Sequence, residues 1–165
     1  MEGSLSGQLL IAAPQLEDYF RRSVVLVLEH NHEGAMGLVL NRPTETMVAE
    51  AVPDLAEVAG ADAVVHAGGP VQPTAVLALA DTGDVPELID ADELNEGTGR
   101  VRVFAGYAGW GPGQLDSELE QDAWITLDAD PDDAFAEGDI WPELLQRKGG
   151  GYALMATMPD DPSLN

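Results

Sequence analysis

The stretch VRVFAGYAGWGPGQLDSELEQ (101–121) joins a strand-like run to a helical pattern through a turn rich in glycine. The run 101–107 has the β-branched and aromatic residues typical of a strand. The turn region holds four glycines: Gly106, Gly109, Gly111 and Gly113. Glycine allows backbone conformations closed to other residues and lets another surface approach closely. Pro112 suits a first helical position, and Leu115 and Leu119 lie four residues apart, so we expect a helix to the end of the stretch.

Outside this stretch, further apolar runs predict strands. SVVLVLEH (23–30) and AMGLVLN (35–41), with a Glu-Gly turn between them, are typical of a hairpin. Three more runs predict strands at 63–69, 74–80 and 123–127. Because strands outnumber helices and hairpins outnumber βαβ units, the predicted fold class is α+β with a mixed, largely antiparallel sheet.

Helical patterns fill part of the remaining chain. We expect a short helix within 47–59, capped by Thr44 and interrupted by Pro53, and two helical segments at 131–137 and 140–147. After a glycine break, 152–158 predicts a final strand. The chain has 165 residues and no internal repeat or low-complexity linker, so a single domain over 1–165 is expected.

The charge balance limits the class of partner. Thirty acidic residues face one lysine and six arginines, which gives a formal net charge of −23. Nucleic-acid affinity rests on Lys and Arg neutralising phosphates, so direct DNA binding is disfavoured. A solvated acidic surface explains the charge most simply, and a basic partner is the alternative.

Composition also bears on location. The absence of cysteine excludes disulfides, thiolate nucleophiles and zinc-thiolate sites. No apolar run approaches the roughly 20 residues of a membrane helix. The apolar run 9–13 is short and has no basic residue before it, so a signal peptide is not expected and the cytoplasm is the default location.

Sequence signatures of catalysis are missing. The chain contains neither a GxSxG elbow nor a GxxxxGK loop. The order of strand, glycine loop and helix at 101–121 resembles a phosphate cradle, but it lacks a lysine. Asp116, Glu118 and Glu120 follow at once, and their carboxylates oppose a phosphate. The pattern therefore favours a structural turn, and we expect no catalytic residue, no cofactor and no enzymatic activity.

The three histidines give weak signals for metal binding. His30 and His32 stand beside Glu29 and Glu33, a set of ligand types that divalent metals accept. A contiguous HNHE in a turn is more typical of a solvated loop tip, so no metal site is predicted. His66 is expected to be a packed or hydrogen-bonded strand residue.

In their order and spacing, five motifs resemble the YqgE/AlgH family over nearly the whole chain. They are GQLLIAAPQL (7–16), FRRSVVLVLEHNHEGAMGLVLNRP (20–43), HAGGPV (66–71), VFAGYAGWGPGQLDSEL (103–119) with Trp124, and PDDPSLN (159–165). The resemblance implies a single-domain α+β fold whose bifurcated sheet forms a pseudo-barrel with flanking helices. It implies no established reaction, because members are described either without an activity or as transcriptional regulators.

Ten positions match the family motifs without being obvious core residues: His30, Asn41, Arg42, Gly68, Gly69, Pro70, Tyr107, Trp110, Gln114 and Glu118. A seven-residue strand spans roughly 23 Å, so His30 and Arg42 should lie at opposite ends of their hairpin. A single compact site containing both is therefore disfavoured. An interaction face that combines Arg42 with the aromatic and polar residues of 107–118 fits better, because arginine and aromatic side chains are frequent anchors of interfaces.

Three functional hypotheses remain. The leading one is a cytoplasmic, non-enzymatic regulator or adaptor that acts through an unidentified protein partner and uses the region 104–118. The second is an enzyme or a small-ligand or nucleotide binder that uses the glycine-rich loop 106–113 with Glu118. The third, a direct DNA-binding regulator, conflicts with the charge of −23. The sequence specifies neither the partner nor the oligomeric state.

Overall fold

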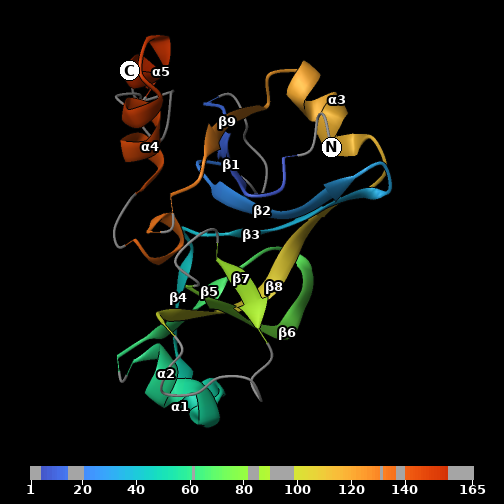
Figure 1. The fold of residues 1–165 in the computed structure, drawn as a ribbon. Coiled ribbons are helices and arrows are strands. Elements are labelled where there is room, and N and C mark those ends of the chain that lie inside the picture. Colours follow the sequence, from blue (N-terminus) through green and yellow to red (C-terminus); the bar gives the residue numbers. More distant parts are fainter. Residues whose placement is uncertain are drawn as a thin grey trace.

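Strand β8 (Val101–Trp110) belongs to two sheets and connects them. The computed structural model describes residues 5–14, 21–60, 62–81, 86–89, 99–130, 132–136 and 140–155. The C-terminal part of β8 pairs antiparallel with β3 (Gly34–Val39). Its earlier residues pair parallel with β5 (Val64–Ala67) and antiparallel with β6 (Val71–Ala80). In Figure 1 this strand runs diagonally between the two parts of the molecule.

The first sheet, here called sheet A, is antiparallel throughout its described pairs. Its order is β8-β3-β2-β1-β9, with β2 at Val24–Asn31, β1 at Gln8–Ala12 and β9 at Trp124–Asp128. Leu9 and Leu26 pack on one face, whereas Leu10 and Val25 pack on the other. Because both faces are buried, these strands have continuous apolar runs rather than an alternating pattern.

Helices cover both faces of sheet A. Helix α3 (Gln114–Glu120) places the buried Leu115 among the residues of one face. Helix α4 (Ile140–Lys148) packs on the opposite face, where the Trp141 indole N–H donates a hydrogen bond to the Ala12 carbonyl oxygen at 2.8 Å. The short helices η3 (Asp133–Phe135) and α5 (Gly151–Met155) flank α4 along the chain. Figure 1 shows α3 and the α4–α5 pair on opposite sides of β1 and β9.

The second sheet, sheet B, has the order β4-β5-β8-β6-β7, with β4 at Pro43–Met47 and β7 at Glu87–Ile89. Three short helices pack against it, namely α1 (Val48–Ala51), η1 (Pro53–Leu55) and α2 (Ala56–Ala59). Val48 and Leu55 from these helices join Val103 of β8 in a separate apolar cluster. No helix in the described ranges is long and apolar enough to cross a membrane.

The two sheets meet where two glycine segments cross. Gly106 has φ +79°, a left-handed conformation that bends β8 between its two sets of partners. A Cβ at Gly106 would overlap the carbonyl oxygen of Gly69, and a Cβ at Gly68 would overlap the carbonyl oxygen of Gly106. The backbones therefore approach to a distance that no side chain would permit.

The predicted fold class is confirmed. The hairpin expected at 23–41 is β2–β3, and the runs 63–69, 74–80, 101–107 and 123–127 overlap with β5, β6, β8 and β9, of which the last three extend beyond the predicted bounds. The sheet is mixed and mostly antiparallel, with β5–β8 as its parallel pair among the described strands. Among the described strands, β4 and β9 stand at the two ends of the strand order and are not paired with each other, so the sheet is not closed.

Several local expectations were wrong. Thr44 lies in β4 and donates to the Val65 carbonyl oxygen at 2.6 Å instead of capping a helix, although the helical region 47–59 is broken as expected. Contrary to expectation, Pro112 is not the first residue of a helix. Helix α3 begins at Gln114, directly after Gly113, which has a left-handed conformation. Residues 152–155 are helical rather than extended and belong to α5, which is separated from α4 by the left-handed Gly149 and Gly150 of the expected glycine break.

Other expectations were incomplete or fall beyond the described residues. Strands β1, β4 and β7 had no sequence prediction. The helix expected at 131–137 is reduced to η3, with 131 and 137 outside the described ranges. Residues 156–158 of the expected last strand and the motif 159–165 also lie outside them.

Replacing Gly106 with alanine tests the crossing. We expect Gly106→Ala to lower the free energy of unfolding by about 3 kcal/mol or more, because a steric overlap with the Gly69 carbonyl adds to the backbone strain. Gly113→Ala is the matched control: its φ is +74° and no heavy atom lies within 4 Å of the added Cβ, so strain alone should cost about 1–2 kcal/mol. Urea denaturation measures both; equal losses would contradict the proposed role of the crossing.

Candidate functional site

Glu118 connects α3 to two tryptophans of sheet A. Its Oε1 accepts hydrogen bonds from the indole N–H of Trp110 at 3.1 Å and of Trp124 at 2.8 Å. Its Oε2 accepts from the Gln114 side-chain amide at 3.1 Å, and the Gln114 oxygen accepts from the Gly111 N–H at 3.0 Å. The two indole rings pack edge to face with centroids 6.2 Å apart. We call these four side chains the Glu118 anchor: Trp110, Gln114, Glu118 and Trp124.

The Glu118 anchor is mainly structural. Trp110 is 6% exposed and belongs to the apolar cluster beneath α3, so the expectation of an exposed aromatic there was wrong. Both oxygens of Glu118 accept from N–H donors, which fixes the carboxylate as a bridge between α3 and the sheet. The outer side of α3 and the turn before it are therefore the parts of this region that are exposed to solvent.

His30 lies near the same helix. Its Nδ1 accepts a hydrogen bond from the Leu5 N–H at 2.9 Å, and its Nε2 lies 3.4 Å from a carboxylate oxygen of Asp116. His30 is only 9% exposed, so the expected solvated loop tip applies to the exposed His32 and not to His30. No group of three or more metal-ligand side chains occurs among the residues described.

Asn41 and Arg42 lie at the other end of the β2–β3 hairpin. The Asn41 amide accepts from the Val24 N–H at 3.0 Å and donates to the Arg22 carbonyl oxygen at 2.9 Å. Arg42 donates to the Arg21 carbonyl oxygen at 3.2 Å. The strand register puts residue 31 opposite residue 34 at one end and residue 25 opposite residue 39 at the other, which confirms that His30 and Arg42 are separated.

The predicted interaction face, which combined Arg42 with residues of 107–118, is therefore not one continuous surface. Trp110, Gln114 and Glu118 lie together, but Arg42 is at the far end of β3. Tyr107 packs on the α4 side of sheet A, opposite to Trp110, because the two residues are three apart in a strand. Gly68 and Gly69 belong to the backbone crossing, and the exposed Pro70 follows them. Whether any of these residues binds a partner stays a prediction.

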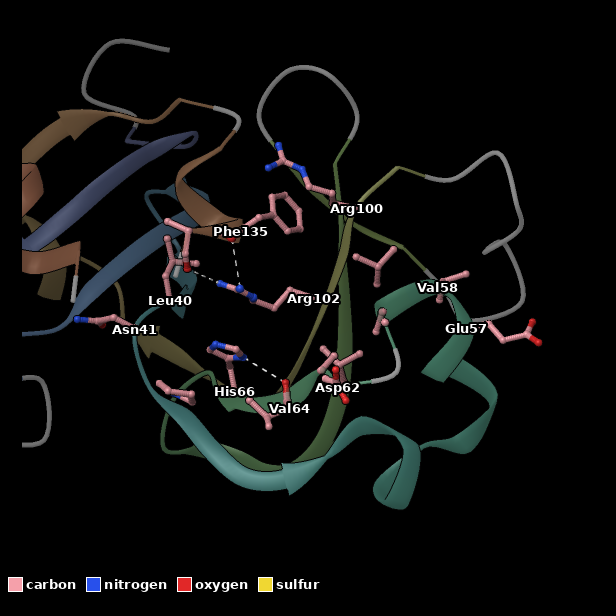
Figure 2. Close-up of a pocket in the computed structure, with 17 residues that line it drawn as sticks. Leu40, Asn41, Glu57, Val58, Asp62, Val64, His66, Arg100, Arg102 and Phe135 are labelled. Carbon is pink, nitrogen blue, oxygen red and sulfur yellow. Dashed lines mark hydrogen bonds between the residues drawn. The ribbon is translucent and has the colours of Figure 1, made fainter. Parts of the chain in front are cut away.

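A cleft of about 620 Å³ opens on sheet B where β5 and β8 separate. Within the described strands, the two pair at His66 with Phe104 and at Ala67 with Ala105, and no pair precedes these. Figure 2 shows the residues that line the opening, which come mainly from the two strands, from α2, from the segment around Phe135 and from the connection between β3 and β4. Of the sequence-predicted positions, Asn41 lines the cleft, and Figure 2 shows its side chain turned away from the interior.

The buried His66 and the partly buried Arg102 are two polar groups of this cleft. The parallel pairing of His66 with Phe104 puts both residues on the same face of sheet B as Arg102, two positions earlier on β8. Arg102 donates from Nη1 to the carbonyl oxygens of Ala134 and Ala136, both at 3.0 Å, which holds its guanidinium against the η3 segment. His66 is 7% exposed, and its Nδ1 lies 3.3 Å from the Val64 carbonyl oxygen, as expected for a hydrogen-bonded strand residue.

Arg100 stands at the edge of the cleft. It hydrogen-bonds to Asp81 at 2.8 Å and to Asp132 at 2.5 Å, and its guanidinium lies 4.8 Å from the centroid of the Phe135 ring. The hydrogen bonds to Asp81 and then to Asp132 raise the pKa of Arg100 above its ordinary value. Neither Arg100 nor Arg102 was predicted as a site residue. The signal available was the alternation of cations and valines in 100–103, which is typical of a strand with one polar face.

Replacing Glu118 with glutamine tests the Glu118 anchor. One accepting oxygen becomes an NH₂ donor, so at least one indole or amide N–H loses its acceptor, and we expect a loss of about 1–2 kcal/mol in the free energy of unfolding. Glu120→Gln, on the exposed side of the same helix, changes the charge equally and should stay within about 0.5 kcal/mol of the parent. Tryptophan fluorescence during urea denaturation measures both variants. Indistinguishable midpoints would show that Glu118 does not anchor α3.

Comparison with known proteins finds relatives that match nearly the whole length of the chain. The sequence model described as AlgH-like matches residues 9–153. A UPF0301 protein of Streptomyces coelicolor is 42% identical, with 98% of this chain and 96% of the relative covered. A UPF0301 protein of Thermobifida fusca is 43% identical over the same shares.

Two solved structures share the fold. The crystal structure of protein DIP2367 from Corynebacterium diphtheriae superposes with a TM-score of 0.84 and 27% identity, covering 93% of this chain and 92% of that chain. The solution structure of the AlgH protein from Pseudomonas aeruginosa has a TM-score of 0.72 and 29% identity, covering 96% of each chain. With the family match, the near-complete coverage and the shared fold in agreement, this chain belongs to the AlgH-like family.

Proposed function

We propose that this protein is a non-catalytic regulator or adaptor of the cytoplasm that acts by binding a protein partner through α3 and the turn before it. The observation that carries the proposal is the Glu118 anchor, which fixes a seven-residue helix to sheet A by its inner side. A helix held this firmly presents its outer side with little loss of conformational freedom on binding.

The outer side of α3 determines the chemistry of the partner. Residues 111–114 are exposed, and so are Asp116, Glu120 and Asp122. The Asp116 side chain is 60% exposed. A partner with a basic surface complements this face, and the net charge of −23 would speed its encounter.

Two alternative functions have less support from the geometry. The second hypothesis places a small ligand on the loop 106–113, but at Gly106 the backbone is already covered by Gly69 and Pro73, which leaves only the later part of the loop open. It also needs Glu118 as a reacting group, whereas both oxygens of this carboxylate accept packing hydrogen bonds. Direct DNA binding remains opposed by the charge.

The partner surface can be tested by changing two exposed carboxylates on α3. We expect Asp116→Asn with Glu120→Gln to weaken partner binding about fivefold to tenfold, because two charges at the contact surface are lost. Glu45→Gln with Glu50→Gln is the matched control, since both residues are exposed and lie on β4 and α1, away from α3 (Figure 1). Quantitative affinity capture with mass spectrometry, followed by titration of the purified partner, measures the difference.

Three results of this experiment are informative. A partner retained by the control and lost from the α3 variant supports the proposal. Equal loss from both variants would show attraction to general negative charge and would overturn the assignment to α3. Equal retention by both would exclude the α3 surface as the contact.

A further inference from the structure

We propose that the cleft between β5 and β8 is a binding site for a small molecule with a flat apolar body and one anionic group. The anionic group would lie at the end formed by His66 and Arg102. This site is independent of the partner surface on α3. The cleft lies beside the first residues of β8, whereas the Glu118 anchor includes Trp110, the last residue of β8.

The cleft exists because two neighbouring strands separate. Pairing between β5 and β8 begins at His66 with Phe104, so the preceding residues of the two strands diverge and form opposite walls. Helix α2 and the segment at Phe135 and Ala136 close the ends. The walls are thus parts of two sheet strands, whose positions are fixed on their other sides by β4 and by β6.

The size and the apolar walls suit a small organic molecule. A volume of about 620 Å³ lies in the usual range for ligand sites, roughly 300–1,000 Å³. Val58, Val64 and Val103 contribute apolar surface, and Phe135 adds an aromatic ring. Together with the His66 imidazole, this ring supplies the kind of flat surface on which a planar ligand packs.

Charge places the anionic group of the ligand at one end. The Arg102 guanidinium is held by three backbone carbonyl oxygens of η3 and its neighbour, so its positive charge is fixed at the wall of the cleft. Figure 2 shows Arg102 and His66 facing the same space. A charge at a partly buried site attracts an anion more strongly than the same charge in bulk water.

The acidic lining residues reinforce this orientation. Glu57 and Asp62 are exposed and lie on the α2 side, and Figure 2 shows Glu57 pointing out of the cleft. Their negative charges would repel an anion at that end, and Asp62 could accept a hydrogen bond from an amino or hydroxyl group there. Arg100 adds a positive charge at the opposite edge of the cleft, where it also offsets the negative charges of Asp81 and Asp132.

Two kinds of compound share this chemistry. A nucleoside monophosphate combines a flat base that carries donors with a phosphate, and an aromatic carboxylate such as 4-hydroxybenzoate combines a ring and a hydroxyl group with a carboxylate. Adenosine monophosphate, 4-hydroxybenzoate and inorganic phosphate are therefore the probes. Titration of the ¹⁵N-labelled full chain, followed by the backbone amide signals of Val64 and Val101, reports binding in the cleft itself.

We expect one of the two ring-containing probes to shift these signals saturably with a Kd of about 1 mM or lower, the weak end of specific binding. Inorganic phosphate should bind at least about tenfold more weakly, because it lacks the apolar body. Binding by the nucleotide or by the carboxylate identifies the source of the shared chemistry, and either supports the proposal.

Three variants locate the binding. Ala59→Leu adds bulk at the cleft wall without changing a charged residue, and it should abolish the shifts. Arg100→Gln should weaken binding about fivefold, since Asp81 and Asp132 are then uncompensated beside the ligand anion. Lys148→Gln is the matched control and should bind like the parent, because it also removes one exposed positive charge, but Lys148 hydrogen-bonds to the Thr126 carbonyl oxygen of β9 and does not line this cleft.

Four outcomes would overturn the proposal. The first is that neither ring-containing probe shifts the cleft signals at about 10 mM, well above the weak end of specific binding. The second is that phosphate binds as tightly as the ring-containing probes. The third is unchanged binding to Ala59→Leu when its amide spectrum shows a folded chain, and the fourth is equal weakening by Arg100→Gln and Lys148→Gln.

Discussion

The fold depends on the contact of two backbone segments, Gly68–Gly69 and Gly106–Tyr107. At Gly68 and at Gly106, a carbonyl oxygen of the other segment occupies the position that a Cβ would need. Because neither segment carries a side chain there, β8 can turn through the left-handed Gly106 and leave sheet B for sheet A. If the two backbone segments lay farther apart, β8 could not pair both with β5 at His66–Phe104 and with β3 at Gly37–Ala108. Of the four glycines near the aromatic residues, Gly106 is therefore the one that lets β8 belong to two sheets.

The bend in β8 also determines where binding surfaces can form. At its end, Trp110 and the following turn bring α3 onto sheet A, and Glu118 closes that contact with hydrogen bonds to two indoles. At its beginning, β8 has turned away from β5, and the separation leaves the cleft beside Arg102. Both surfaces thus have the same origin, although a folded partner and a small molecule make different demands. The first needs an exposed rigid surface, whereas the second needs a concave one with few polar groups.

Features that depend on neighbouring residues could be predicted from the sequence. The β2–β3 hairpin is one, because its strands and turn are contiguous, and the separation of His30 from Arg42 followed from strand length alone. The burial of Trp110 could not be predicted in this way, because it depends on Trp124 and on the position of α3 across sheet A. The cleft was equally hidden, since it arises where two strands nearly forty residues apart in the sequence stop pairing. Local sequence patterns thus identified most helices and strands. The candidate site could not be predicted in the same way, because it depends on how elements far apart in the sequence are arranged in space.

The distribution of positive charge in an acidic chain links the two proposed surfaces. Arg100, Arg102 and Arg147 all contact the segment 132–136, through carboxylates or backbone carbonyls. These cations hold that segment between β8 and α4, and the same arrangement leaves positive charge at one end of the cleft. A basic protein is attracted to the chain from a distance by its charge of −23, whereas a small anion is repelled until it reaches the cleft. Salt screens the distant interaction more than the short, partly buried one. Added salt should therefore weaken association with a basic partner and leave anion binding in the cleft much less affected, so the two surfaces respond to different physical conditions on one scaffold.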